Sequence, residues 1–325
     1  MYRLLSRNTP LAYAALLILL VALRGRTLYD PARFVVADSP DLFPPLWLTL
    51  TQHIAPASTL AVILAIATTY LTALIINNIA NRFGLAPERS ALAGFFFIVL
   101  SGAFRLSLAL QPIYLFALAL VWAMDRLFSA TNKDKPQASI AWAFAIVTIG
   151  SLVWPKGLTF IPLLLVLISL LRIGGPRSYA AALVGIVATL FVSFTLLTLS
   201  PTPMESIHAY IRSALATQPY WRLGPVSITY LAIELGIIVM ALLNTQRRLL
   251  ELSISTSRKI RSAEWLFFFS LLLILLPGFS CETQILVAIG PALILPRYIQ
   301  GIRSARVREA IPIVMTAATA YLIYA

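Results

Sequence analysis

The sequence predicts an all-α fold, a polytopic bundle of transmembrane helices with about 11 spans. Three observations predict it. Of the 325 residues, 60% are hydrophobic and only 11% are charged, whereas about 25% of a soluble domain is charged. The apolar residues form continuous runs, which differ from the alternating ten-residue strands of a membrane β-barrel. The hydrophobic content is also too high for a disordered chain. Together these features exclude a soluble enzyme, a fibrous protein and a disordered tail.

Eleven apolar windows can be marked along the chain, mostly ended by Pro, Gly or charged residues. Several are shorter than the roughly 20 residues that a bilayer requires. Two pairs of windows are almost continuous, so we expect tight hairpins or broken helices covered by neighbouring helices. The windows are 11–23, 57–76, 90–104, 106–124, 138–153, 158–171, 179–199, 226–243, 265–279, 283–296 and 311–324.

Charge predicts the orientation of these windows. A cytoplasmic N-terminus places 18 Lys and Arg residues in inside loops and seven outside, which is the bias that bilayer insertion produces. The net charge of +13 then needs no nucleic-acid partner. The chain is predicted to be a single integral membrane domain over 1–325, with long outer loops at 24–56 and 200–225 and a C-terminus in the periplasm. We interpret 11–23, which follows Arg3 and Arg7, as an uncleaved first helix.

The predicted topology places the acidic residues in two groups, one on each side of the membrane. On the outer side, Glu205, His208 and Arg212 share one helical face, which is typical of an interfacial helix or of a headgroup or phosphate site. On the inner side, six acids lie among basic residues and are interpreted as a solvated face. These six are Glu88, Asp125, Asp134, Glu251, Glu264 and Glu309.

Two further acidic residues each allow two interpretations. Glu234 lies inside an apolar window, where an acid needs a partner or a cavity, and Tyr230 on the same face indicates either a structural hydrogen bond or a proton relay. Glu282 precedes a predicted helix, where the helix dipole favours an acid, and it also lies on the outer side. The single cysteine, Cys281, excludes a disulfide within the chain and a cysteine-based metal cluster. No Walker A or HExxH motif is present.

The order of these features resembles the GT-C fold of membrane glycosyltransferases that use polyprenyl-phosphate sugars. In this fold a first helix is followed by an outer loop with an acid and then by compact hairpins. Residues 1–200 are also similar in order and hydrophobic texture to a poorly characterised family of Bacteroidetes inner-membrane proteins. The stretches that carry the resemblance are 89–94, 111–114, 125–127, 149–157 and 289–296.

The resemblance implies transfer of a sugar from a polyprenyl-phosphate donor at the outer face of the bacterial inner membrane. In such chemistry a carboxylate either deprotonates the acceptor hydroxyl or holds a divalent cation on the phosphate. The candidate catalytic residues are Asp30, Asp38 and Asp41. The candidate substrate-binding residues are His208, Arg212, Arg222 and Glu282.

Two other functions fit the sequence. One is a non-catalytic membrane component of an envelope assembly or secretion complex, which would be indifferent to loss of the three aspartates. The other is a lipid or solute transporter, which would need inverted repeats or several intramembrane charges, and the sequence shows neither. Membrane lipids are the expected partners in every case.

Overall fold

The computed structural model describes residues 1–30, 44–52, 54, 58–102, 110–198, 203–215, 225–274, 276 and 283–324. Within these residues every regular element is helical, which confirms the all-α prediction. The longer helices are α2 (Pro10–Leu23), α5 (Thr59–Arg82), α6 (Leu92–Ser101), α7 (Pro112–Ala130), α8 (Gln137–Val153), α9 (Phe160–Leu171), α10 (Pro176–Thr198), α11 (Pro203–Leu215), α12 (Pro225–Arg248), α13 (Ile254–Ile274), α15 (Ile289–Gln300) and α16 (Ala305–Tyr324). The shorter ones are α1 (Tyr2–Leu5), α3 (Gly25–Tyr29), α4 (Pro45–Thr51), η4 (Pro155–Thr159), η5 (Leu249–Glu251) and α14 (Gln284–Val287).

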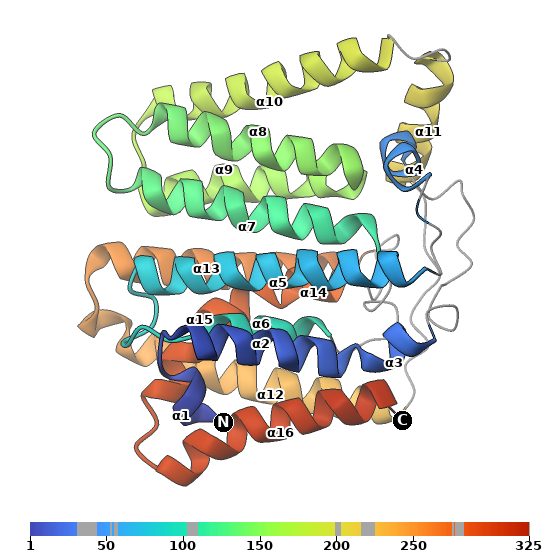
Figure 1. Ribbon diagram of the computed structural model, residues 1–325. Coiled ribbons are helices and arrows are strands. Elements are labelled where there is room, and N and C mark those ends of the chain that lie inside the picture. The colour runs from blue at the N-terminus through green and yellow to red at the C-terminus, as the bar shows by residue number, and fades with distance from the viewer. Residues whose placement is uncertain are drawn as a thin grey trace.

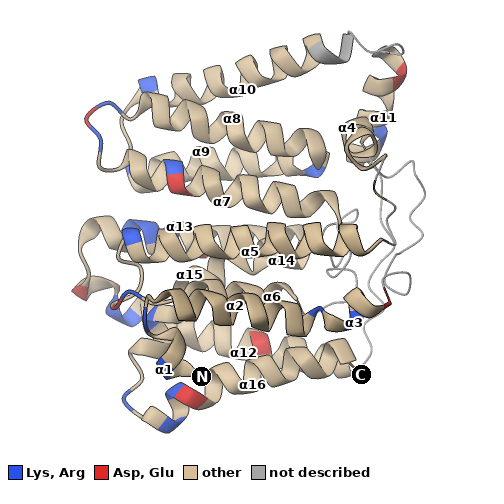
Figure 2. Cartoon of the chain, in the orientation of Figure 1, with Lys and Arg blue, Asp and Glu red and all other residues tan. Residues whose placement is uncertain are grey.

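The chain runs back and forth between two ends of one bundle (Figure 1). One end carries the connections 83–91, 131–136, 172–175, 249–253 and 301–304, and we call it the basic end. Most of the Lys and Arg residues gather there (Figure 2). The other end carries the short helices α3 and α4 together with α11, and we call it the α11 end.

The predicted windows correspond to helices of this bundle, with shifted boundaries. The window 265–279 belongs to α13, which begins earlier, at Ile254, and the window 57–76 belongs to α5, which continues to Arg82. Between α8 and α9 the chain forms the 3-10 helix η4, as expected for a tight hairpin. Four helical segments of the described chain are long and apolar enough to cross a membrane: Thr59–Arg82, Pro112–Ala130, Pro176–Thr195 and Val226–Glu251.

The shorter helices lie in the interior of the bundle. All ten residues of α6 are buried, because α5, α15, α14 and α16 surround the helix. The pair α14–α15 is interrupted near Ala288, and Gly290 lets α15 approach α13 closely, since a Cβ there would meet the Ala263 carbonyl at 2.6 Å. Helices too short to span a bilayer are tolerated where protein covers their ends.

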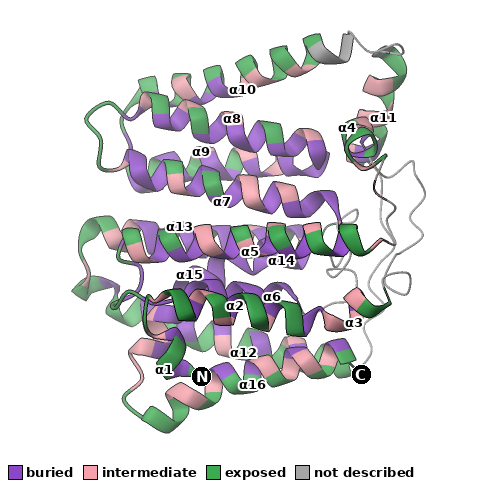
Figure 3. Ribbon diagram, in the orientation of Figure 1, coloured by how far each residue is buried: buried purple, intermediate pink, exposed green. Residues whose placement is uncertain are grey.

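The outer helices expose apolar side chains instead of covering them. On α10, Leu183, Val184 and Phe191 are each at least 60% exposed, and green exposed residues recur along the described part of this helix (Figure 3). A soluble protein rarely exposes a continuous apolar patch of this kind. Such exposure suits a lipid environment, in agreement with the four helical segments that are long and apolar enough to cross a membrane.

Candidate functional site

Helix α11 lies on the surface of the bundle at the α11 end. Pro203 occupies its first turn, where the missing N–H is not needed. The face toward the bundle carries the buried Ser213 and the half-buried Tyr210, whose hydroxyl donates to the Ser151 carbonyl at 3.1 Å. Burial raises the pKa of Tyr210 to about 12, against a small lowering by that hydrogen bond. The tyrosine therefore stays neutral and fixes α11 against the end of α8.

The polar residues predicted on this helix point away from the bundle. Glu205, His208 and Arg212 are all exposed, as the shared helical face predicted. The same helix also exposes Met204 and Leu215, each at least 70%. A helix with exposed charges beside exposed apolar side chains suits the boundary between headgroups and acyl chains.

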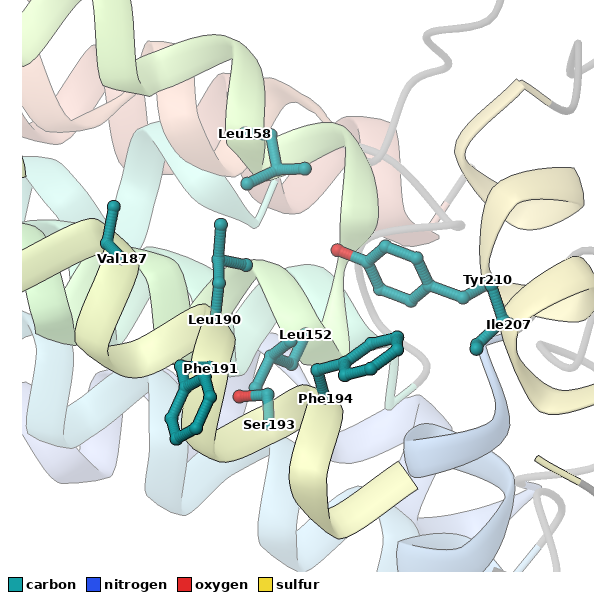
Figure 4. Close-up of a pocket in the computed structure, with 9 residues that line it drawn as sticks. All are labelled: Leu152, Leu158, Val187, Leu190, Phe191, Ser193, Phe194, Ile207 and Tyr210. Carbon is teal, nitrogen blue, oxygen red and sulfur yellow. The ribbon is translucent and has the colours of Figure 1, made fainter. Parts of the chain in front are cut away.

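An apolar pocket of about 480 Å³ lies directly beneath α11 (Figure 4). Ile207 and Tyr210 of α11 form one wall, Leu158 of η4 another, and α10 contributes Phe191 and Phe194. Figure 4 shows the Tyr210 ring extending from α11 toward the bundle over this space. The pocket has no charged lining residue, so it suits a hydrocarbon chain.

A second pocket of about 590 Å³ continues the first one between α8 and α10. The two share Leu152 and Ser193, and the second reaches Ala138 at the start of α8. Gly185 allows α10 to approach the Ala141 carbonyl of α8 along this pocket. We call the two pockets together the α8–α10 groove. It follows α8 from near the basic end to the underside of α11.

Asp30 stands apart from this groove. It follows α3, it is exposed, and its backbone N–H bonds the Arg26 carbonyl at 3.1 Å. In Figure 1, α3 and α11 occupy separate parts of the α11 end, so the structure does not bring Asp30 next to Arg212. The other predicted site residues, Asp38, Asp41, Arg222 and Glu282, lie outside the described residues.

A buried arginine near Asp30 was not predicted as a functional residue. Arg24 is 1% exposed, and its Nη2 donates to the Thr69 hydroxyl at 3.1 Å and to the Tyr114 hydroxyl at 2.9 Å. Its guanidinium also lies 5.3 Å from the Tyr114 ring centroid. Next to it, Arg26 donates to the Tyr324 carbonyl at 2.8 Å. These contacts join the start of the first outer loop to α5, α7 and α16.

Two acids inside the bundle also have partners that the sequence did not identify. Glu234 is 5% exposed and accepts a hydrogen bond from Gln284 Nε2 at 3.0 Å. Tyr230, the predicted partner, does lie beside the Glu234 carboxyl, and it also shares a hydrogen bond with Thr319 at 3.2 Å. Glu264 is not on a solvated face as predicted: it is also 5% exposed and accepts from Gln246 at 2.7 Å. Only the packing of α13 against its neighbours reveals this burial.

No family model, curated protein or solved structure matches this chain. Within the described residues, no three His, Cys, Asp or Glu side chains come together as a metal site. The chemistry of the α11 end is therefore argued from its geometry.

Proposed function

We propose that this chain is a multi-pass protein of the bacterial inner membrane that binds a polyprenyl phosphate and transfers the sugar it carries, in the manner of the GT-C enzymes. The observation that supports the proposal best is the α8–α10 groove. It is apolar, it follows a helix pair along the bundle, and it ends under a helix that exposes His208 and Arg212.

The proposed placement in the bilayer follows from the two ends of the bundle. We place the basic end in the cytoplasm, because Lys and Arg resist translocation, and the α11 end in the periplasm. Eleven crossings then connect the two sides, from α2 to α16. The N-terminus is cytoplasmic, and the C-terminus is periplasmic.

A polyprenyl phosphate fits this placement. Its hydrocarbon chain would occupy the groove and gain dispersion contacts with the apolar lining, since the surrounding lipid tails are as apolar as the groove and supply no hydrophobic driving force. Its phosphate would reach the bilayer surface beside α11. There Arg212 offers a planar set of donors suited to phosphate oxygens, and His208 on the same face adds a further donor.

The reaction itself needs a carboxylate at the same side of the membrane. We assign this role to the first outer loop, with Asp30, Asp38 and Asp41 as candidates. One of them would take the proton of the acceptor hydroxyl while the phosphate leaves from the sugar, or would hold a divalent cation on that phosphate. A protein that binds the lipid phosphate but transfers nothing would instead be a non-catalytic envelope component.

The binding step is tested with purified full-length protein in detergent and undecaprenyl phosphate as the probe, followed by native mass spectrometry. Ala188→Phe fills the groove, and Arg212→Ala removes the proposed phosphate ligand. Each is expected to weaken binding about tenfold, which corresponds to the loss of about 1.4 kcal/mol. Matched controls are Leu183→Phe, on the same helix but outside both pockets, and Arg177→Ala, an exposed arginine at the basic end.

The transfer step is tested in membranes given a polyprenyl-phosphate sugar. Asp→Asn at positions 30, 38 and 41 together is expected to slow donor consumption by about 10²–10⁴, the usual contribution of a general base, with lipid binding unchanged. Full consumption by the triple variant excludes this chemistry. Equal binding by Ala188→Phe and wild type excludes the groove.

A further inference from the structure

A cluster of polar groups lies inside the bundle, at the point where α6 ends. The last turn of α6 presents the Val99 and Leu100 carbonyls to side chains from two other helices, α14 and α16. Gln284, at the start of α14, donates from Nε2 to the Leu100 carbonyl at 3.3 Å and to Glu234 Oε1 of α12 at 3.0 Å. Thr319 of α16 lies 3.4 Å from the Val99 carbonyl. We call Val99, Leu100, Glu234, Gln284, Thr319 and Tyr230 the Glu234 centre.

Oxygen atoms dominate this centre. Tyr230 and Thr319 share a hydrogen bond of 3.2 Å, and the Thr319 hydroxyl also bonds the Met315 carbonyl at 2.9 Å. Val99 and Leu100 are among the last four carbonyls of α6, which have no partner within their own helix. One carboxylate, two hydroxyls and two helix-end carbonyls therefore come from α6, α12 and α16.

The acid of the centre has no basic partner among the described residues. Glu234 is 5% exposed, and its Oε2 accepts no hydrogen bond within the described residues, although the Tyr230 hydroxyl lies close to the carboxyl. None of the salt bridges within those residues involves Glu234. The C-terminal end of α6 adds the negative end of a helix dipole. Buried negative charge without a counter-charge is costly in a bilayer interior.

We propose that the Glu234 centre binds a desolvated monovalent alkali cation of the size of Na⁺. A single carboxylate balances one positive charge, whereas a divalent ion would leave an excess charge in the membrane interior. Helix-end carbonyls and hydroxyls replace the hydration shell of such ions where helices are broken inside a membrane. Gln284 acts as a positioning residue, because its amide holds Glu234 Oε1 and leaves Oε2 for the ion.

This site is separate from the proposed sugar-transfer site. The Glu234 centre is built by α6, α12, α14 and α16, whereas the α8–α10 groove is built by α8, η4, α10 and α11. The cation would hold the end of α6 and the start of α14 together. Its binding is therefore expected to stabilise the protein even where the groove variant Ala188→Phe has lost lipid binding.

The experiment measures thermal unfolding of the purified full-length protein in detergent at pH 8. It compares NaCl, KCl and choline chloride at equal ionic strength. A cation that binds only the folded state raises the melting temperature in a saturable way. We expect NaCl to raise it by about 2–4 °C over choline chloride, the shift that a modest gain in stability produces in a large domain.

Variants separate this site from a general salt effect. Glu234→Gln and Thr319→Val are expected to lose the Na⁺ shift, while Thr319→Ser, which keeps the hydroxyl, retains it. Glu264→Gln is the matched control, because Glu264 is equally buried but belongs to a different cluster, with Gln246. Direct binding of ²²Na⁺ to the wild-type protein gives a second measurement that needs no variant.

Two outcomes would overturn the proposal. Equal melting temperatures in the three salts, with no saturable ²²Na⁺ binding, would show that no alkali cation binds. A melting temperature that rises on acidification in choline chloride, with no further effect of Na⁺, would show that Glu234 takes a proton instead.

Discussion

Arg24 is fully buried at the end of α2, where the first helix turns into α3. Its guanidinium bonds the Thr69 and Tyr114 hydroxyls and faces the Tyr114 ring. Arg is suited to this environment because its planar group donates several hydrogen bonds and stacks on aromatic rings, whereas the ammonium of Lys is shorter in reach and strongly hydrated. Arg24 therefore positions α2 on α5 and α7 at the α11 end.

We expect Arg24→Lys to lower the free energy of unfolding by about 1–3 kcal/mol, because the buried hydroxyl partners lose charge-assisted hydrogen bonds. The measurement is thermal unfolding in detergent, followed by tryptophan fluorescence. The control is Arg7→Lys, since Arg7 is exposed at the basic end. Identical melting temperatures for Arg24→Lys and wild type would show that the contacts of Arg24 do not contribute to stability.

Burial of single polar residues was the least predictable feature of this sequence. Arg24 and Glu264 lie within a few residues of other charged side chains, Arg26 and Arg261, so the local composition indicated solvated loops. Gln284 and Thr319, which complete the Glu234 centre, lie about 50 and 85 residues from Glu234 in the chain. Their proximity depends on how α6, α12, α14 and α16 pack, and a hydropathy pattern carries no information about that packing.

At the scale of helices, the apolar windows predicted where elements exist but not where they end. Helix α5 continues past its window to Arg82 because Asn77 and Asn81 find partners: Asn77 donates to the Tyr13 hydroxyl at 2.8 Å, and Asn81 donates to the Ser90 carbonyl at 3.0 Å. Helix α13 begins before its window because Lys259 packs over the Phe83 ring at 4.6 Å. Tertiary partners thus extend helices into polar sequence.

The close packing of α15 against α13 leads to a prediction about the stability of glycine-to-alanine variants. A Cβ on Gly290 would meet the Ala263 carbonyl at 2.6 Å and Phe267 Cβ at 2.7 Å, so Gly290→Ala forces α15 away from α13. Such overpacking costs about 1–3 kcal/mol. A Cβ on Gly236 of α12 would meet no atom within 4 Å, so Gly236→Ala is expected to raise stability by about 0.5–1 kcal/mol through helix propensity.

Thermal unfolding of the two alanine variants in the same detergent measures this difference. Gly236→Ala serves as the matched control, because the substitution is identical and only the available space differs. A Gly290→Ala protein as stable as Gly236→Ala would mean that α13 and α15 do not approach as closely as the structure shows.

At the scale of the whole molecule, the two ends of the bundle differ in charge. The loops of the basic end carry most of the Lys and Arg residues (Figure 2), and the alternation of helices between the ends follows the order of the apolar windows. The class of fold could therefore be predicted from hydropathy and charge alone. The α8–α10 groove could not, because it depends on small residues of α8 and α10, such as Ala141 and Gly185, facing each other across two helices.

The orientation of the whole bundle is tested by labelling single cysteines from outside intact cells, in a chain whose native cysteine is replaced by Cys281→Ser. Glu205→Cys reports on α11, and Asp134→Cys and Ser255→Cys report on the basic end; all three positions are exposed. Since Lys and Arg resist translocation, we expect a membrane-impermeant maleimide to label position 205 only. Permeabilised cells should allow labelling at all three positions, which shows that each cysteine reacts.

Labelling of 134 and 255 but not 205 in intact cells would show that the bundle has the opposite orientation, with the proposed phosphate site facing the cytoplasm. Labelling of 134 but not 255 would place the two connections on opposite sides of the membrane, which the back-and-forth path of α8 to α13 does not allow.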